Sequence, residues 1–457
     1  MLSLHIQHFT HTVHMSRYVY SLHDYHAIKK AVITIDGITV LSGENGCGKS
    51  TLSKWLYYLV NGAERFDVYV YNSFIGGVQE IISRLNVVRR EIDRYNDNAN
   101  YTFFRDGEMK MHRLAGEESQ ENIDNTIIIF NTILDRFVKI LSDYLKQNPS
   151  VRMKERMLRY LDIDIPDNTH IDERLEDFAC NQRNAVHRLY DRYATDKDER
   201  NKERFLSLLH TEFGIKDKPP VNMQFEEEEV KLFKKNRVGN LFNLHKAIYV
   251  DTPMAVSEEF AYDNKFWDNL QDLMIYPAKD MHRSDASLKI GRRIERLIKG
   301  QVKVSKDDFN QNELHYVRED GLDIKLDDVA TGFKTFSYIQ RLLENGYLND
   351  DTLLMIDEPE AHLHPQWIVE FAHLLVLLNK ELGVKIMVAS HNPDMVAAIQ
   401  AISKKEERAD VTRFYIAEPS ESPYTYSYRE LGNSVEDIFK SFNIAYERIE
   451  QYGETGI

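Results

Sequence analysis

The nine residues GENGCGKST, Gly43–Thr51, constrain the fold of this chain more than any other segment. An apolar run at 38–41 precedes them and is typical of a β-strand, while apolar residues recur at helical spacing from 52 to 59. Asn61-Gly62 predicts the end of that helix. A glycine-rich loop between a strand and a helix lets backbone N–H groups surround phosphates at the positive end of the helix dipole. The segment therefore predicts a nucleotide phosphate loop.

Within this loop, Lys49 is expected to reach the β- and γ-phosphates of ATP, and the Ser50 hydroxyl is expected to ligate Mg²⁺. The predicted ATP-binding residues are Asn45, Gly46, Cys47, Gly48, Lys49, Ser50 and Thr51. The alternative is a chance glycine-rich turn. The complete motif and its correct flanks favour the phosphate loop.

A second motif, TLLMIDEPEAHLHP at 352–365, joins a buried apolar strand to two adjacent carboxylates. Because the carboxyl ends of parallel strands face the ligand, Asp357 is expected to hold Mg²⁺, through water, and Glu358 to orient or deprotonate the attacking water. The plainer interpretation is an acidic region before the helix that begins near Pro365. The two interpretations are compatible.

The segment VKIMVASHNPDMV repeats this layout, with Ser390 and His391 at the end of an apolar strand. A single histidine is more often structural than functional. Its place on the strand after the Asp-Glu pair favours a catalytic role for His391 beside Glu358.

These motifs, in this order, resemble the ABC-type ATPase heads of the SMC, RecF and OLD group, in which the last motif supplies a switch histidine. Such heads also have a signature helix before the Asp-Glu pair. Here DVATGFKTFSYIQRLL places Gly332 25 positions before Asp357. The resemblance implies that Thr331, Gly332 and Lys334 contact a nucleotide held by a second subunit, although Phe333 replaces the second glycine of the motif. Without its neighbours, this segment reads equally well as an ordinary capped amphipathic helix.

The long separation between motifs predicts a split head. Gly332 follows Gly48 by 284 positions, far more than in the nucleotide domains of ABC transporters, which makes a transporter subunit improbable. The inserted region sustains no heptads and is expected to form a compact helical domain. The predicted fold is therefore α/β, an ABC-ATPase head of the P-loop class with a mixed sheet. Its parts are 1–75, a helical insertion at 76–243, and 244–457 with signature, Asp-Glu pair and switch histidine. The strands and helix after His391 leave no room for a C-terminal TOPRIM nuclease such as OLD proteins carry.

Composition sets the class of protein. With 457 residues and 42% hydrophobic content, the chain is globular and has no apolar run near the roughly 20 residues that cross a bilayer. Since the N-terminus also lacks a secretory layout, a cytoplasmic location is expected. Cys47 and Cys180 are interpreted as reduced thiols. A net charge of −15 argues against a generally basic surface for nucleic acid.

Three further patterns in the sequence are weaker. His5, His8, His11 and His14 recur every third residue, which alternates faces on a strand, so a structural interpretation is favoured over a metal site. The charged runs at 226–229 and 196–204 are interpreted as solvated faces. Tyr18 and Tyr20 occupy the region where related heads place an aromatic ring on adenine.

The sequence thus predicts an ATPase that works with ATP and Mg²⁺ as a homodimer or higher homo-oligomer, and that does not enter the membrane. In layout it resembles the stand-alone ATPases of bacterial anti-phage systems, those of Septu (PtuA) first and PARIS (AriA) second. That resemblance implies a separately encoded nuclease partner, of HNH type first and TOPRIM type second, with DNA or a phage component as open further partners. The alternatives are a RecF-like repair or recombination ATPase that binds DNA directly, and a nucleotide-binding scaffold with negligible turnover.

Overall fold

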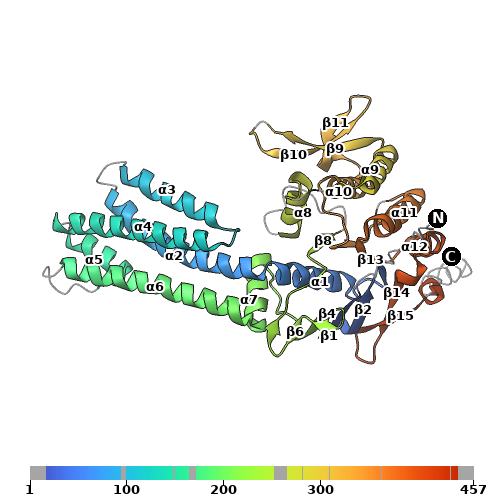
Figure 1. Ribbon diagram of the computed structural model, residues 1–457, viewed down its shortest axis with the longest axis horizontal. Coiled ribbons are helices and arrows are strands. Elements are labelled where there is room, and N and C mark those ends of the chain that lie inside the picture. The colour runs from blue at the N-terminus through green and yellow to red at the C-terminus, as the bar shows by residue number, and fades with distance from the viewer. Residues whose placement is uncertain are drawn as a thin grey trace, which may run out of the picture. The chain divides into compact units, whose positions relative to one another are not determined.

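The computed structural model describes residues 17–93, 99–147, 150–163, 171–251, 265–279, 281, 283–307, 309–361, 363–432 and 434–440. The chain forms two compact units, shown in Figure 1. The first, here called the head, comprises 1–64 and 209–457, and the second, the helical unit, comprises 65–208.

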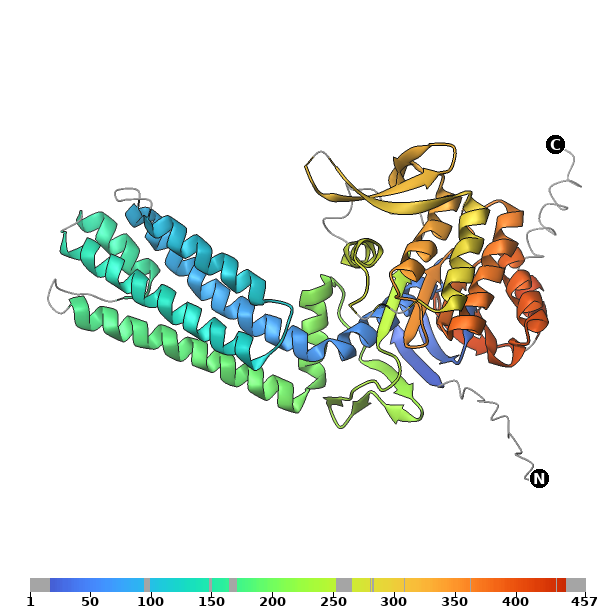
Figure 2. The ribbon, with the colours of Figure 1, turned by 45° about the horizontal axis from the view of Figure 1, so that its top comes forward.

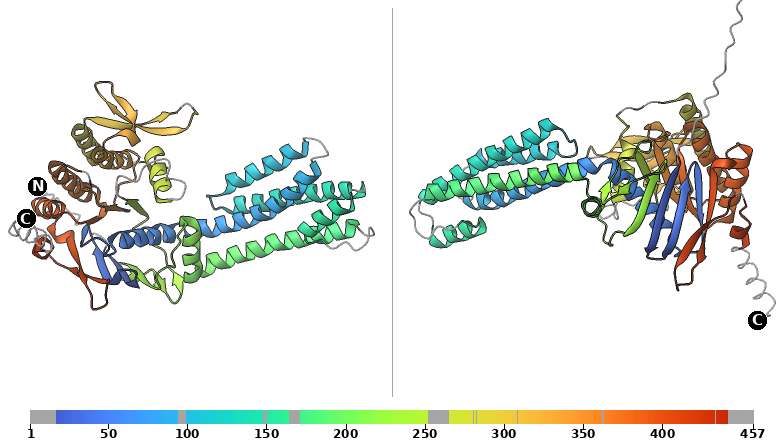
Figure 3. Two further views of the ribbon diagram at one scale, coloured as in Figure 1. Left: turned by 180° about the vertical axis from the view of Figure 1, so that it is seen from behind. Right: turned by 60° about the horizontal axis from the view of Figure 1, so that its bottom comes forward.

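The head is organised by one mixed sheet with the strand order β5-β4-β1-β2-β15-β14-β3-β13-β12-β8. Its strands are β1 (Tyr18–Tyr25), β2 (Ile28–Ile35), β3 (Ile38–Ser42), β4 (Asn222–Glu227), β5 (Val230–Lys231), β8 (Lys246–Val250), β12 (Thr352–Asp357), β13 (Lys385–Ser390), β14 (Thr412–Pro419) and β15 (Tyr426–Glu430). The run from β14 to β8 is parallel, and β1 pairs with β2 and β4 in the antiparallel part (Figure 3). All residues of β3, β12 and β13 are buried, which explains their continuous apolar runs.

Helices cover both faces of the parallel strands (Figure 2). The head contains α1 (Lys49–Glu64), α8 (Lys265–Ile275), α9 (Asp285–Ile298), α10 (Thr331–Glu344), α11 (Pro365–Leu382) and α12 (Pro393–Lys405), with the 3-10 turns η2 (Leu326–Asp328) and η3 (Ala409–Val411). Helix α1 packs against β8, β12 and β13, while α11 packs against β13, α9 and α12. Gly383 ends α11 in the left-handed conformation, as expected at a helix C-terminus.

Two small sheets complete the head. One has the order β11-β10-β9, formed by β9 (Gly300–Lys306), β10 (Asn312–Arg318) and β11 (Asp323–Lys325). The other pairs β6 (Phe233–Lys234) with β7 (Arg237–Val238). The three-stranded meander leads into α10, as the sequence predicted.

The helical unit is built from long amphipathic helices. These are α2 (Phe66–Asp93), α3 (Ala99–Leu114), α4 (Gln120–Lys146), α5 (Val151–Tyr160), α6 (Ile171–Glu199) and α7 (Lys202–Phe213), the last of which continues into the head. Helices α2, α4 and α6 lie side by side (Figure 1). Ser119 caps α4 by accepting a hydrogen bond from the Asn122 backbone N–H at 3.1 Å. The compact helical insertion predicted from the sequence is present.

The limits of this unit differ from the predicted 76–243. Asn61-Gly62 does not end the helix, because α1 continues to Glu64 and the chain passes directly into α2. At the other end, β4 pairs with β1 and so belongs to the sheet of the head. The insertion therefore ends at residue 208, well before the predicted limit of 243.

The charged runs are not simply solvated. Glu227 is buried, and its carboxylate accepts hydrogen bonds from the backbone N–H groups of Phe242 at 2.6 Å and Asn243 at 2.7 Å. Within 196–204, Arg204 Nε donates to Asp196 Oδ2 at 2.6 Å, and both side chains are largely buried. These carboxylates stabilise local structure, because each is paired with the donors that burial demands.

Candidate nucleotide site

The loop after β3 has the backbone that a phosphate cradle requires. Gly46 and Gly48 have φ angles of 83° and 96°, which L-residues rarely adopt. A Cβ on Gly48 would stand 2.7 Å from Cγ1 of Ile28, whereas one on Gly46 would meet no atom within 4 Å. The loop thus needs glycine at both positions, and at Gly48 it needs the space as well.

Lys49 begins α1 and turns back over the loop. Its Nζ donates hydrogen bonds to the carbonyl oxygens of Gly43 at 2.9 Å and Glu44 at 3.0 Å, and only 7% of the residue is exposed. Burial of a lysine with only neutral partners leaves its charge available to an anion in the loop. Cys47 is buried behind the loop, and Tyr428 OH donates to its carbonyl oxygen at 3.2 Å.

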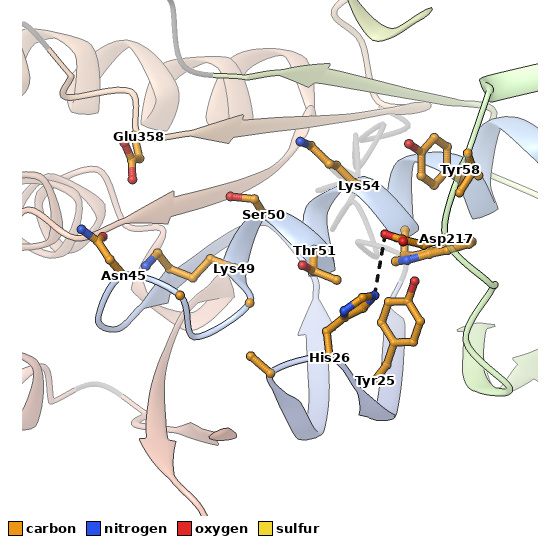
Figure 4. A pocket seen from close by; sticks show the side chains of 15 residues that line it. Tyr25, His26, Asn45, Lys49, Ser50, Thr51, Lys54, Tyr58, Asp217 and Glu358 are labelled. Atoms are coloured by element: carbon orange, nitrogen blue, oxygen red, sulfur yellow. Dashed lines mark ion pairs between the residues drawn. The ribbon is translucent and has the colours of Figure 1, made fainter. Parts of the chain in front are cut away.

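A pocket of about 470 Å³ opens over this loop (Figure 4). Of the predicted ATP-binding residues, those that line it are Asn45, Gly46, Gly48, Lys49, Ser50 and Thr51. Glu358 faces the same space from the end of β12, so a phosphate-binding loop and a carboxylate share one cavity.

Asp357 lies behind this pocket with 2% of its surface exposed. Its two carboxylate oxygens accept hydrogen bonds at 2.9 Å, from Ser53 Oγ and from Tyr249 OH. Burial raises the pKa of Asp357, and hydrogen bonding from Ser50, Ser53 and Tyr249 opposes that rise. Ser50 and Asp357 therefore offer neighbouring oxygen ligands of the kind that Mg²⁺ prefers.

Glu358 and His391 lie together where β12 and β13 end. His391 Nδ1 is 3.3 Å from Glu358 Oε1, and both side chains reach solvent. Glu358 has a left-handed φ of 48°, and its backbone N–H donates to the Ala389 carbonyl oxygen at 2.8 Å. Such strained backbone at a non-glycine residue is concentrated in functional sites.

The predicted signature residues lie at the start of α10 and do not line this pocket. Lys334 Nζ donates to the Asp327 carbonyl oxygen at 2.6 Å. Phe333 packs between Tyr316 and Trp367, with ring centroids 6.1 Å and 5.3 Å away. The aromatic residue in place of the second glycine thus has a packing role within the head.

The proposed adenine contacts Tyr18 and Tyr20 are wrong, because both are fully buried on the inner face of β1. Tyr25 and His26, at the end of the same strand, line the pocket instead. The other lining residues that sequence reasoning missed are Ala27, Lys54, Trp55, Tyr58, Ile215 and Asp217.

Aromatic side chains pack around the part of the pocket that Tyr25 and His26 line. Tyr25 meets the Trp55 ring edge-on at 5.8 Å, and its hydroxyl donates to the Lys218 carbonyl oxygen at 3.0 Å. His26 Nε2 lies 3.8 Å from Asp217 Oδ2. Tyr25 belongs to a tyrosine-rich segment at 18–25, which is a sequence signal for an aromatic contact, whereas 215–217 joins the pocket only because the fold brings it there.

Two other sequence expectations can be compared with the structure. Cys47 and Cys180 are both free thiols, as predicted. The histidines at 5, 8, 11 and 14 lie outside the described residues.

The fold and the site together define a P-loop ATPase head of mixed α/β architecture, with a helical unit inserted after the first helix. Residues 21–396 match the family described as AAA ATPase domain, and the chain belongs to this family.

Curated relatives match over a short segment. The energy-coupling factor transporter ATP-binding proteins EcfA3 and EcfA2 of Clostridium perfringens are 31% and 30% identical to this chain over 96 residues. This segment is 21% of the chain, and it spans about a third of the length of these relatives.

Solved structures align over most of the chain, with low TM-scores. The SMC head domain from Thermotoga maritima is 10% identical, with a TM-score of 0.34, over 91% of this chain and 98% of that one. An ATP-binding cassette of an ABC transporter in its ADP conformation is 9% identical, with a TM-score of 0.31, over 88% and 87%. Among the described residues, no helix is long and apolar enough to cross a membrane.

Proposed function

We propose that this chain binds ATP with Mg²⁺ and hydrolyses it to ADP and phosphate. The observation that carries the proposal is the shared cavity in which Lys49 and Ser50 face the Glu358 carboxylate. The loop N–H groups and Lys49 bind the phosphates. Ser50 and Asp357 hold the metal ion, which when bound neutralises phosphate charge.

Glu358 acts as the base in this proposal. It accepts a proton from water as the water oxygen bonds to the γ-phosphorus and the bond to the β–γ bridging oxygen breaks. ADP leaves with the electron pair of that bond. His391, 3.3 Å from Glu358, contacts the γ-phosphate and keeps the carboxylate oriented.

The site is completed by a second copy of the chain. Thr331, Gly332 and Lys334 stand outside the pocket of their own head, at a helix N-terminus suited to an anion. In a homodimer, or in a larger homo-oligomer built from such pairs, these residues bind the γ-phosphate held by the partner head. ATP then favours the closed pair, and hydrolysis releases it.

Glu358→Gln tests both the base and the dimer. The variant keeps a hydrogen-bonding side chain but cannot take the proton, so ATP remains bound and the closed dimer accumulates. Thr331→Arg places a bulky cation at the interface and blocks closure, while the single chain still binds ATP. Size exclusion with light scattering, with ATP and Mg²⁺, distinguishes the two. Wild-type behaviour of both variants would disprove the composite site.

For the biological role, we propose a cytoplasmic anti-phage defence complex in which this ATPase gates a separately encoded nuclease. An HNH nuclease, as in Septu with PtuA, is the first candidate, and a TOPRIM nuclease, as in PARIS with AriA, is the second. The proposal is supported by the motif order and by the helical unit, a separate compact body of which no described residue lines the nucleotide pocket.

Co-expression with the neighbouring genes and pull-down on this chain tests that role. We expect a nuclease to co-purify and its DNA cleavage to depend on the nucleotide state, with Lys49→Ala as the matched control. DNA cleavage by this chain alone, lost on mutation outside the ATP site, would contradict the proposal. Tight DNA binding with no partner would favour the RecF-like alternative.

A further inference from the structure

Glu360 lies two residues beyond Glu358 and has no role in the chemistry described so far. Only 5% of the residue is exposed. Its Oε1 accepts hydrogen bonds from Ser390 Oγ at 2.7 Å and from the His391 backbone N–H at 3.1 Å. One carboxylate oxygen thus joins the turn after β12 to the end of β13.

The same oxygen also faces the histidine ring. His391 Nδ1 lies 3.8 Å from Glu360 Oε1 and 3.3 Å from Glu358 Oε1. The buried carboxylate and the proposed base therefore both approach the same ring nitrogen, Nδ1 of His391. Both the backbone and the ring of His391 are held by contacts with these two residues.

A buried carboxylate at this position is costly. Burial raises the pKa of Glu360, and its Oε2 has no hydrogen-bond partner among the described residues. Unsatisfied buried polar atoms in a native structure call for a specific explanation. The contacts of the other oxygen, Oε1, supply an explanation for the buried carboxylate, because they hold His391, the residue next to the proposed base Glu358.

We propose that Glu360 is a positioning residue that acts through His391. It holds the His391 backbone and ring so that the imidazole meets Glu358 and the γ-phosphate. This inference rests on the proposed ATPase function and adds a residue to it. Glu360 does not line the nucleotide pocket, so it affects turnover without affecting ATP binding.

The test measures kcat and KM for ATP in the full chain. Glu360→Ala removes the acceptor and lowers kcat about tenfold or more, since positioned acid–base groups contribute roughly 10²–10⁴-fold. KM and ATP affinity stay unchanged. Glu360→Gln keeps an acceptor oxygen for Ser390 and His391 and restores most of the turnover. Glu381→Ala and Glu381→Gln, at an exposed position of α11, are matched controls with wild-type rates.

A double-mutant cycle shows whether Glu360 acts through His391. In a His391→Ala background, Glu360→Ala causes no further loss of kcat. Independent, multiplicative losses would overturn the inference. So would wild-type turnover by Glu360→Ala, or equal losses of stability and ATP affinity in both Glu360 variants. Absence of ATP hydrolysis by the wild-type chain would instead refute the proposed function itself.

Discussion

Replacing Gly48 by alanine separates two reasons for glycine in the phosphate loop. The first is conformational, because a left-handed backbone costs an L-residue roughly 1–2 kcal/mol. The second is steric, because the new Cβ would stand 2.7 Å from Ile28 Cγ1 and 3.2 Å from Cδ1. Overpacking of this kind costs about 1–3 kcal/mol. We therefore expect Gly48→Ala to lower the free energy of unfolding of the head by about 2–5 kcal/mol.

Gly46→Ala is the matched control within the same loop. Gly46 also has a positive φ, of 83°, but a Cβ there meets no atom within 4 Å. It should therefore show only the conformational cost of about 1–2 kcal/mol. Both changes reduce the freedom of the unfolded chain equally, so this contribution cancels in the comparison.

A cycle with Ile28→Ala isolates the steric contribution. Removing the Ile28 side chain opens space for the new methyl group, so Gly48→Ala should cost only about 1–2 kcal/mol in that background. Urea unfolding without nucleotide is the assay. Trp55, Trp267 and Trp367 are the three tryptophans of the chain and all belong to the head, so their fluorescence reports that unit. Equal costs for Gly46→Ala and Gly48→Ala, or no coupling with Ile28→Ala, would refute the steric reasoning.

Three further variants address the nucleotide. Lys49→Ala should abolish ATP binding in calorimetry, because it removes the cation held over the loop by Gly43 and Glu44; unchanged affinity would contradict this. Tyr249→Phe should raise the Mg²⁺ concentration for half-maximal turnover, since it removes one of the hydrogen bonds on buried Asp357. Each of these hydrogen bonds is worth about 1.5–3 kcal/mol. An unchanged Mg²⁺ dependence would count against a metal role for Asp357. Tyr25→Ala should weaken ATP binding by about 1–3 kcal/mol, because the adenine base loses its stacking contact with the Tyr25 ring. The binding of inorganic triphosphate, which has no base, should stay intact. Equal losses for both ligands would exclude a contact between Tyr25 and the base.

Local sequence patterns were sufficient to predict the phosphate loop and the central strands of the head. The phosphate loop needs its glycines whatever surrounds it. The central positions of the buried parallel strands β12 and β13 are apolar, so both features leave a continuous signal in the sequence. The alternation along β1 carried a usable signal too. Tyr18, Tyr20 and Leu22 share its buried face, which excludes the two tyrosines from a nucleotide pocket.

Contacts between segments that lie far apart in the chain could not be predicted from local sequence patterns. Ile215 and Asp217 reach the pocket from a segment far along the chain from the loop. The pairing of β4 with β1 sets the limit of the insertion, and nothing within β4 itself indicates its partner. Glu360 reads as one more acidic residue before a helix, and only its hydrogen bonds to Ser390 and His391 distinguish it.

Adjacent carboxylates at the end of β12 have opposite environments, and this difference explains how they can do different work. Asp357 still belongs to the regular strand, is 2% exposed, and has hydrogen bonds on both oxygens, so its position is fixed. The left-handed backbone of Glu358 turns the next side chain out of the sheet, where it is 36% exposed and faces the pocket. That conformation costs on the order of 1–3 kcal/mol and is held by the hydrogen bond from Glu358 N–H to the Ala389 carbonyl oxygen. The strained backbone therefore separates two consecutive carboxylates, so that in the proposed mechanism Asp357 can hold the metal ion while Glu358 meets the attacking water.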